Sequence, residues 1–195
     1  MAKAQAIAVT GQAVLGLLAD NIPKSEFTNA RFELYQTASF TPPTMEEGIS
    51  LFLYRVEINS ALRNLPAKTG LDGITRRPPL PLDLYYLLTV WAKDAVKQQR
   101  ILGWAMRTLE DAPVLSAARL NHFGTETDVF QPGEKVELIF NSLSLQDLSN
   151  LWSAFKMSVP MSVAYIARVV GIDSTIPSED SAPVQTRQID FEKKV

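Results

Sequence analysis

The chain contains no cysteine. This absence excludes disulfide bonds, thiolate zinc sites and cysteine nucleophiles. No uninterrupted apolar run reaches the roughly 18 residues that a membrane-spanning helix needs, so we expect no membrane span. An excess of charge of either sign is also absent, because 19 basic and 21 acidic residues leave a net charge of −2. The chain as a whole therefore lacks the basic field that would hold nucleic acid, and we predict no nucleic-acid partner.

Residues that carry catalysis are equally scarce. The single histidine, His122, lies near Glu126 and Asp128, a set that could bind a divalent metal but is also a common surface pattern. A Ser/His/Asp triad would need the same histidine, and no G-x-S-x-G motif accompanies it. Residues 67–70 (Ala-Lys-Thr-Gly) lack the residue order of a phosphate-binding loop. We therefore predict no catalytic residues, no metal site, no cofactor and no enzymatic activity.

What the chain does have is an ordinary globular composition. Its 195 residues are 46% hydrophobic, which is enough for one domain with a sizeable core. Period-two alternation predicts strands at residues 31–36, 49–59, 82–92, 135–141 and 158–173. Helices are expected at residues 4–20, 94–111 and 116–122 and from residue 144 onward. Because the first three strands have no helices between them, the order predicts an α+β domain, a single mixed or antiparallel sheet of about five strands with helices packed on it.

The domain should occupy residues 1–173. Its predicted core collects apolar residues from shared faces of strands and helices: Phe52, Tyr54, Leu84, Tyr86, Leu88, Leu102, Met106, Leu151 and Trp152. Residues 174–195 are rich in Ser, Pro, Gln, Glu and Lys, so we expect a disordered polar tail.

A long connection, residues 60–81, separates two strands that would pair as an extended hairpin. It carries the one basic cluster of note: Arg63, Lys68, Arg76 and Arg77. Connections of this length inside a compact domain are usually functional or mobile. These four residues are our candidate interface, an arm that docks on an acidic partner surface. A solvated basic loop is the main alternative, and nucleic-acid binding ranks third.

Several segments, taken in their order and spacing, carry a family resemblance. They are residues 51–57 (Leu-Phe-Leu-Tyr-Arg-Val-Glu) followed by Asn59, and residues 76–82, 84–89, 102–107, 113–115, 148–152 and 162–165. Together they resemble the N-terminal domain of the terminator, or cap, proteins of extracellular contractile injection systems, which are phage-tail-like particles.

The resemblance implies a tail-terminator-like fold and a structural role. Such a protein would end the inner tube and contractile sheath as a homo-oligomeric ring, a hexamer, with the terminal tube protein and the sheath protein as partners. It would be found in the bacterial cytoplasm during assembly and afterwards in the particle. The alternative is a monomeric peptide- or ligand-binding adaptor without catalysis, which mass measurement in solution would distinguish.

Overall fold

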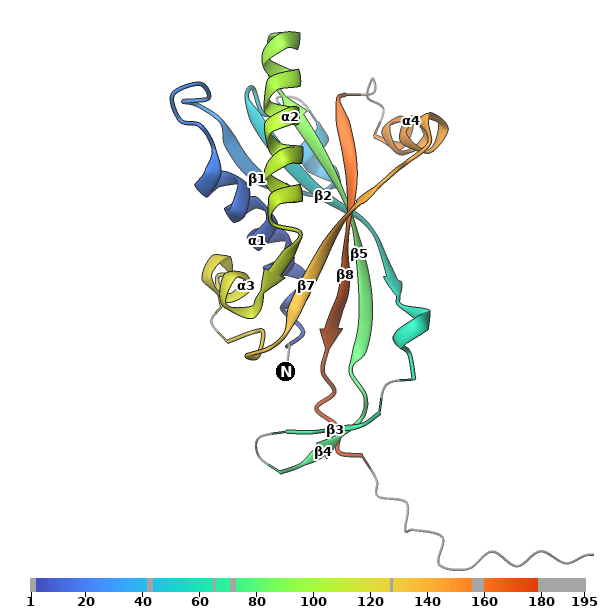
Figure 1. Ribbon diagram of the computed structural model, residues 1–195. Helices are drawn as coiled ribbons and strands as arrows, with labels where there is room; N and C mark the ends of the chain where they lie inside the picture. Colours follow the sequence, from blue (N-terminus) through green and yellow to red (C-terminus); the bar gives the residue numbers. More distant parts are fainter. Residues whose placement is uncertain are drawn as a thin grey trace, which may run out of the picture.

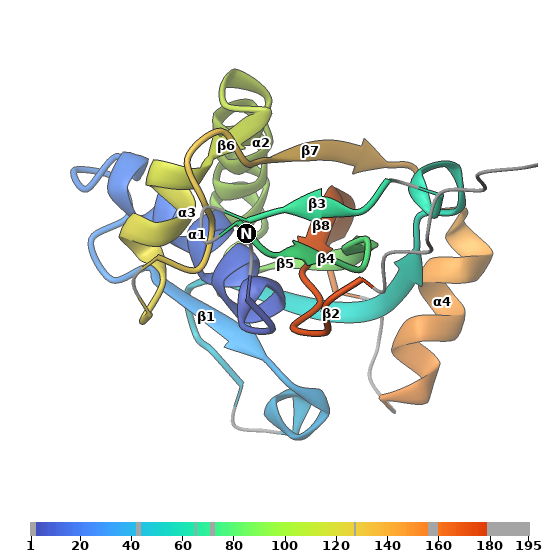
Figure 2. The same ribbon diagram turned by 90° about the horizontal axis from the view of Figure 1, so that it is seen from below.

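Six strands form the central sheet of the computed structural model, which describes residues 3–41, 44–64, 66–70, 73–126, 128–155 and 160–178. The spatial order is β1-β2-β5-β8-β7-β6 (Figure 1). Only β1 and β2 run parallel; all other neighbours are antiparallel. The sheet is therefore mixed, and it curls into a half-barrel (Figure 2). The strands are β1 (Arg31–Tyr35), β2 (Gly48–Ile58), β5 (Leu80–Trp91), β6 (Val114–Ser116), β7 (Lys135–Asn141) and β8 (Ser162–Ile172).

The predicted α+β class is confirmed, and the count of about five strands is one short. The missed strand is β6, which pairs with β7 through only three residues and leads directly into a helix. A segment this short has no alternation to detect. Strand β8 begins at Ser162; residues 158 and 159 of the predicted strand lie outside the described residues.

Helices cover the two faces of the sheet unequally. Helices α1 (Ala6–Asn21), α2 (Ala95–Asp111) and α3 (Ala117–Phe123) lie on one side, and α4 (Leu145–Ala154) lies on the other (Figure 1). Two caps fix helix starts: the Asp94 carboxylate accepts from the Lys97 N–H at 2.8 Å, and the Ser144 hydroxyl accepts from the Asp147 N–H at 3.1 Å. Within the described residues, no helix has the length and apolar character needed to cross a bilayer.

The core has two parts. The larger one joins α1, α2 and α3 to one sheet face and includes Leu18, Leu84 and Leu88, each 0% exposed. The smaller one, which we call the aromatic cluster, joins the 3-10 helix η1 (Thr37–Phe40) to α4 on the other face. There Phe40 stacks on Phe155 at 4.6 Å and meets Trp152 edge-on at 5.1 Å. Such ring pairs stabilise beyond the apolar area that they bury.

Four of the predicted core residues are buried: Leu84, Tyr86, Leu88 and Trp152. The other five are only partly buried: Phe52, Tyr54, Leu102, Met106 and Leu151. In α2 the fully buried positions are instead Ile101, Ala105 and Leu109. Leu102 and Met106 are neighbours of these positions in the sequence and are only partly buried.

A β-bulge explains the error in β2. Pairing between β2 and β5 shifts register between Leu53 and Arg55, so Tyr54 is the extra residue. A bulge breaks period-two alternation and bends the strand. Beyond it, Val56 and Ile58 are 44% and 47% exposed. The residues that β2 does bury in the larger core, Ile49 and Leu51, precede the bulge.

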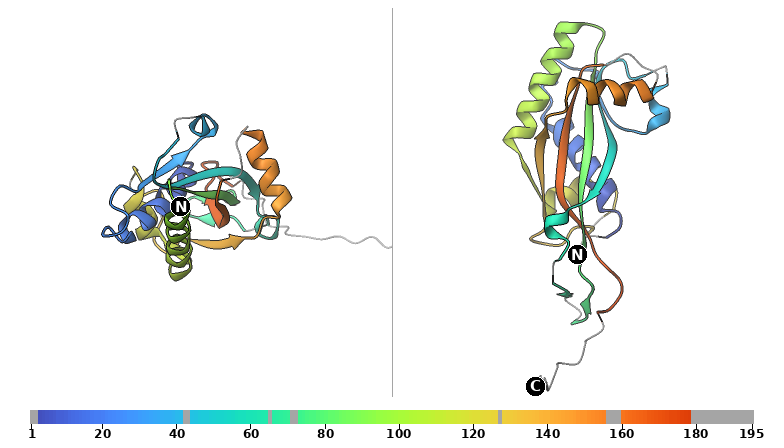
Figure 3. Two further views of the ribbon diagram at one scale, coloured as in Figure 1. Left: turned by 90° about the horizontal axis from the view of Figure 1, so that it is seen from above. Right: turned by 90° about the vertical axis from the view of Figure 1, so that its right-hand side faces the viewer.

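The predicted extended hairpin is confirmed. Strands β2 and β5 pair along almost their whole length, and the chain between them forms a projecting arm. The arm contains the 3-10 helix η2 (Ser60–Leu62) and a two-stranded sheet of β3 (Lys68–Thr69) and β4 (Thr75–Arg76). It extends beyond the end of the main sheet (Figure 3, right).

Candidate assembly surfaces

The arm is closed by hydrogen bonds from three chain segments. Lys68 pairs with Arg76 and Thr69 with Thr75, and the two threonine hydroxyls lie 3.0 Å apart. Gly73 adopts a φ of +77° in the turn, which glycine accommodates without steric cost. Residues 176–178 add a third segment: the Arg77 N–H donates to the Ile176 carbonyl at 3.1 Å, and the Ser178 N–H donates to the Thr75 carbonyl at 2.8 Å. The arm is therefore an ordered element and not a bare loop.

The structure places the four candidate interface residues along this arm. Arg63 follows η2 and is exposed, and Arg77 follows β4 and is exposed. Arg76 is half-buried, and its guanidinium donates to the Ile74 carbonyl at 3.4 Å. Lys68 lies opposite Arg76 in the backbone register. Of the three described side chains, Arg63 and Arg77 are thus the more accessible to a partner.

The base of the arm is fixed by Asn59, which is 6% exposed. Its side-chain oxygen accepts from the Ala61 and Leu62 N–H groups at 3.1 and 3.2 Å. Its amide nitrogen donates to both carboxylate oxygens of Asp83, at 3.2 and 3.0 Å. This one side chain therefore starts η2 and ties it to β5, which sets the direction in which the arm leaves the sheet.

Asp83 also stabilises a bulge on the next strand. Pairing between β5 and β8 shifts register between Leu82 and Leu84, and the Asp83 carboxylate accepts from the Val169 N–H at 3.1 Å. Val169 has a φ of +60°, a conformation that is a steric outlier for a β-branched residue. The sheet thus bends at bulges on both sides of β5, close to the base of the arm. Neither bulge was predicted from the sequence. Asn59 was singled out there only as part of the segment that carries the family resemblance.

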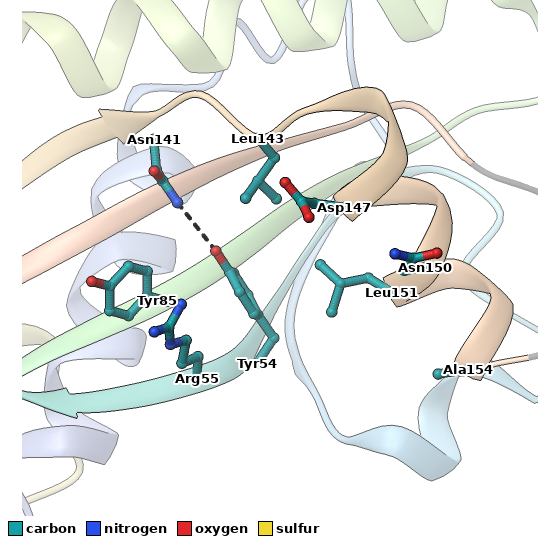
Figure 4. Close-up of a pocket in the computed structure, with 9 residues that line it drawn as sticks. All are labelled: Tyr54, Arg55, Tyr85, Asn141, Leu143, Asp147, Asn150, Leu151 and Ala154. Carbon is teal, nitrogen blue, oxygen red and sulfur yellow. Dashed lines mark hydrogen bonds between the residues drawn. The ribbon is translucent and has the colours of Figure 1, made fainter.

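A half-open pocket of about 520 Å³ lies between the sheet and α4 (Figure 4). Tyr54, Arg55 and Tyr85 line it from the strands, and Asp147 and Leu151 line it from α4. The Tyr54 hydroxyl accepts a hydrogen bond from the Asn141 amide at 3.2 Å, as Figure 4 shows. Partial burial raises the pKa of Tyr54 above its usual value, so this phenol is neutral and serves as a hydrogen-bonding group.

Three polar side chains beside this pocket, Tyr85, Glu57 and Arg55, bind one another. The Tyr85 hydroxyl donates to Glu57 at 2.7 Å, and Arg55 forms an ion pair with the same carboxylate. The Arg55 guanidinium also lies 5.1 Å from the centre of the Tyr85 ring. The hydrogen bond from Tyr85, followed by the Arg55 contacts, lowers the pKa of Glu57. No nucleophile with an adjacent base lines the pocket, so its chemistry is that of a contact surface.

The residues weighed as a metal site do not converge. His122 is exposed at the end of α3, and in the ranges that the structure covers no three His, Asp or Glu side chains are grouped to hold a metal. Residues 68 and 69 belong to β3 and are followed by a turn and not by a helix, which differs from a phosphate-binding loop.

An α+β domain with a projecting arm and open sheet edges is typical of a subunit that works through contacts with other subunits. Residues 10–186 match the model of the Pvc16 N-terminal domain family. The chain belongs to this family, and the resemblance seen in the sequence is confirmed. No match to a curated protein was found.

Two solved structures are similar in fold to this chain. One is the sheath/tube terminator of the extracellular contractile injection system PVC in its extended state, with a TM-score of 0.63 and 14% identity, over 96% of this chain and 64% of that chain. The other is the tube-terminating cap of the anti-feeding prophage, with a TM-score of 0.49 and 21% identity, over 92% of this chain and 61% of that chain. The chain therefore spans somewhat less than two thirds of the length of either protein.

Proposed function

We propose that this chain is a structural terminator, without catalytic activity, that ends the inner tube and contractile sheath of a contractile injection particle. The observation that carries the proposal is family membership over residues 10–186. The fold shared with a sheath/tube terminator supports it. The terminator acts as a homo-oligomeric ring, a hexamer, whose partners are the terminal tube protein and the sheath protein. It assembles in the bacterial cytoplasm and remains in the particle.

The arm is the docking element in this proposal. A ring presents every arm once per subunit, so weak contacts are repeated around the axis and gain by multivalency. A single exposed ion pair contributes only about 0–1 kcal/mol and is screened by salt. Arg63 and Arg77 therefore act as members of a repeated array that faces acidic groups on the neighbouring subunit or on the sheath.

The test of the terminator is deletion of the protein from a particle-producing strain. We expect particles of irregular length, or tubes and sheaths that fail to remain associated, in electron micrographs. Normal, stable particles of wild-type length would overturn the proposal. Mass measurement on the purified protein separates the ring from the monomeric adaptor, for which the half-open pocket beside Tyr54 would be the binding site.

The test of the arm is charge reversal. Arg77→Glu changes an exposed side chain, whereas the double variant Arg76→Glu, Arg77→Glu also removes the Arg76 bond to Ile74. Both should reduce the yield of capped particles, with unchanged melting for Arg77→Glu. Lys135→Glu, an exposed reversal at the start of β7, is the matched control. A wild-type yield with Arg77→Glu and with the double variant would show that the arm is only solvated.

A further inference from the structure

Strand β1 is an edge of the central sheet, with β2 as its only strand neighbour in the described chain. The Arg31 N–H donates to the Glu47 carbonyl at 3.0 Å, so the backbone of Arg31 faces β2. In a parallel pair, alternate residues direct both backbone groups to the same side. Phe32 and Leu34 therefore direct their N–H and C=O groups to the open edge. These four groups form a short template for one more strand.

A groove runs beside the same edge. It has a volume of about 360 Å³ and is lined by Leu15, Ala19, Phe32, Leu34 and Phe123, with Gln12 as the polar member. Leu34 is 44% exposed although its side chain lines this apolar surface. The residues with open backbone groups are thus the ones whose side chains line the groove. A strand added to β1 would place every second side chain against it.

The opposite face of β1 shows which side chains of an added strand would be polar. Arg31 and Glu33 are exposed there, so side chains pointing to that face remain in water. The occupant must therefore alternate apolar with polar residues over a short segment. Residues 188–192 of this chain, Gln-Ile-Asp-Phe-Glu, have that pattern, with Ile189 and Phe191 two positions apart.

The route of the chain sets the distance that a C-terminal strand must cover to reach an open β1 edge. Residues 176–178 are hydrogen-bonded to the arm, which projects beyond the end of the sheet (Figure 1). Strand β1 pairs with residues 48–52 of β2, whereas the arm leaves β2 after Ile58. Six residues of strand separate these points by about 20 Å. Residues 179–187 can span about 30 Å when extended, so residues 188–192 can lie well away from the arm of their own subunit.

We propose that residues 187–193 of one copy bind as a strand along the open edge of β1 in the next copy. Ile189 and Phe191 enter the groove between α1, α3 and β1, and Gln188 and Asp190 face solvent beside Arg31 and Glu33. The inference rests on the proposed function, because a ring supplies the adjacent copy. It names a contact that links subunits in sequence around that ring.

The test uses disulfide linking in a chain that has no cysteine of its own. Leu34→Cys and Ile189→Cys are carried by two differently tagged copies, which are expressed together with the other particle proteins and then oxidised. Because side chains alternate, Leu34→Cys should link to Ile189→Cys or Phe191→Cys several-fold more than to Gln188→Cys. Glu33→Cys should show the reverse preference. Two further variants of the acceptor copy, which is then linked through Phe32→Cys, should reduce linking. Leu34→Pro removes an N–H group of the open edge, and Leu34→Lys places a charge beside the apolar groove. Neither variant removes a backbone hydrogen bond to β2.

Each outcome decides the inference. Linking between copies with this alternating preference supports it, whereas linking only within single chains overturns it in favour of a tail folded on its own domain. A benzophenone maleimide on the Leu34→Cys thiol reports any other occupant, and photo-crosslinks to the tube or sheath protein alone would also overturn it. Normal capped particles without any linking would contradict this contact but would not contradict the terminator function. Failure of the terminator itself is seen separately, in the deletion strain.

Discussion

Leu88 illustrates how single residues support the curled sheet. It lies in the middle of β5, is 0% exposed, and pairs with Leu51 on one side and Val163 on the other. Leu88→Ala should lower the free energy of unfolding by about 2–5 kcal/mol, because it removes buried methyl groups and leaves a cavity. Denaturant melts measure this change. Leu145→Ala is the matched control, because Leu145 is 80% exposed, and an equal loss for both would show that the burial of Leu88 is wrong.

The pair of Tyr85 and Glu57 supplies a pH-dependent contact. The Tyr85 hydrogen bond lowers the pKa of Glu57, and the same bond raises the pKa of Tyr85. A lowered carboxyl pKa means that the contribution to stability is present above the unfolded pKa and is lost as pH falls through the folded pKa. Tyr85→Phe should therefore move the Glu57 pKa upward in a carboxyl NMR titration. An unchanged titration would mean that the contacts of Arg55 alone hold the carboxylate.

At the scale of elements, the sequence predicted what depends on local periodicity. Helix α2 and strands β1, β5 and β7 lie within one or two residues of their predicted bounds. The bulges at Tyr54 and Val169 were not predictable, because a bulge arises from pairing with another strand and leaves no local signature. The consequence is seen at Tyr54, which was assigned to the core but is the extra residue of the bulge and is only partly buried.

In the candidate interface, too, the local features were predictable from the sequence and the pairing between distant segments was not. A long basic connection was visible in the sequence. Its third segment was not visible, because residues 176–178 come from a region whose composition predicts disorder. These hydrogen bonds join segments about a hundred residues apart, and the conformational preferences of single residues do not specify such tertiary contacts. For the same reason the sequence did not show that the Arg76 side chain turns back onto the arm.

Ser178, the last described residue, is bound to the arm, so truncations on either side of it test different contacts. The Ser178 N–H donates to Thr75, so a chain ending at Ser178 keeps this bond and one ending at Pro177 loses it. Removing residues 179–195 should leave the melting temperature of the isolated domain unchanged, because this mostly polar segment adds little to the core of its own domain and, in the contact proposed above, binds a neighbouring copy. Thermal melts of the two truncated chains provide the comparison. A clear loss of stability in the longer one would indicate a tail docked on its own domain.

For the whole molecule, stability and assembly are assigned to different parts. The two cores lie in the sheet and helices, while β3 and β4 pair with each other and with residues 176–178. Replacing residues 63–77 with a short Asn-Gly turn should therefore leave cooperative unfolding of the body nearly unchanged. The same variant should fail to restore normal capped particles in a deletion strain if the arm docks on a neighbour. Circular dichroism melts and particle yield are measured on the one variant. Loss of both properties would show that the arm is part of the fold, and retention of both would show that the ring forms through the sheet edges without it.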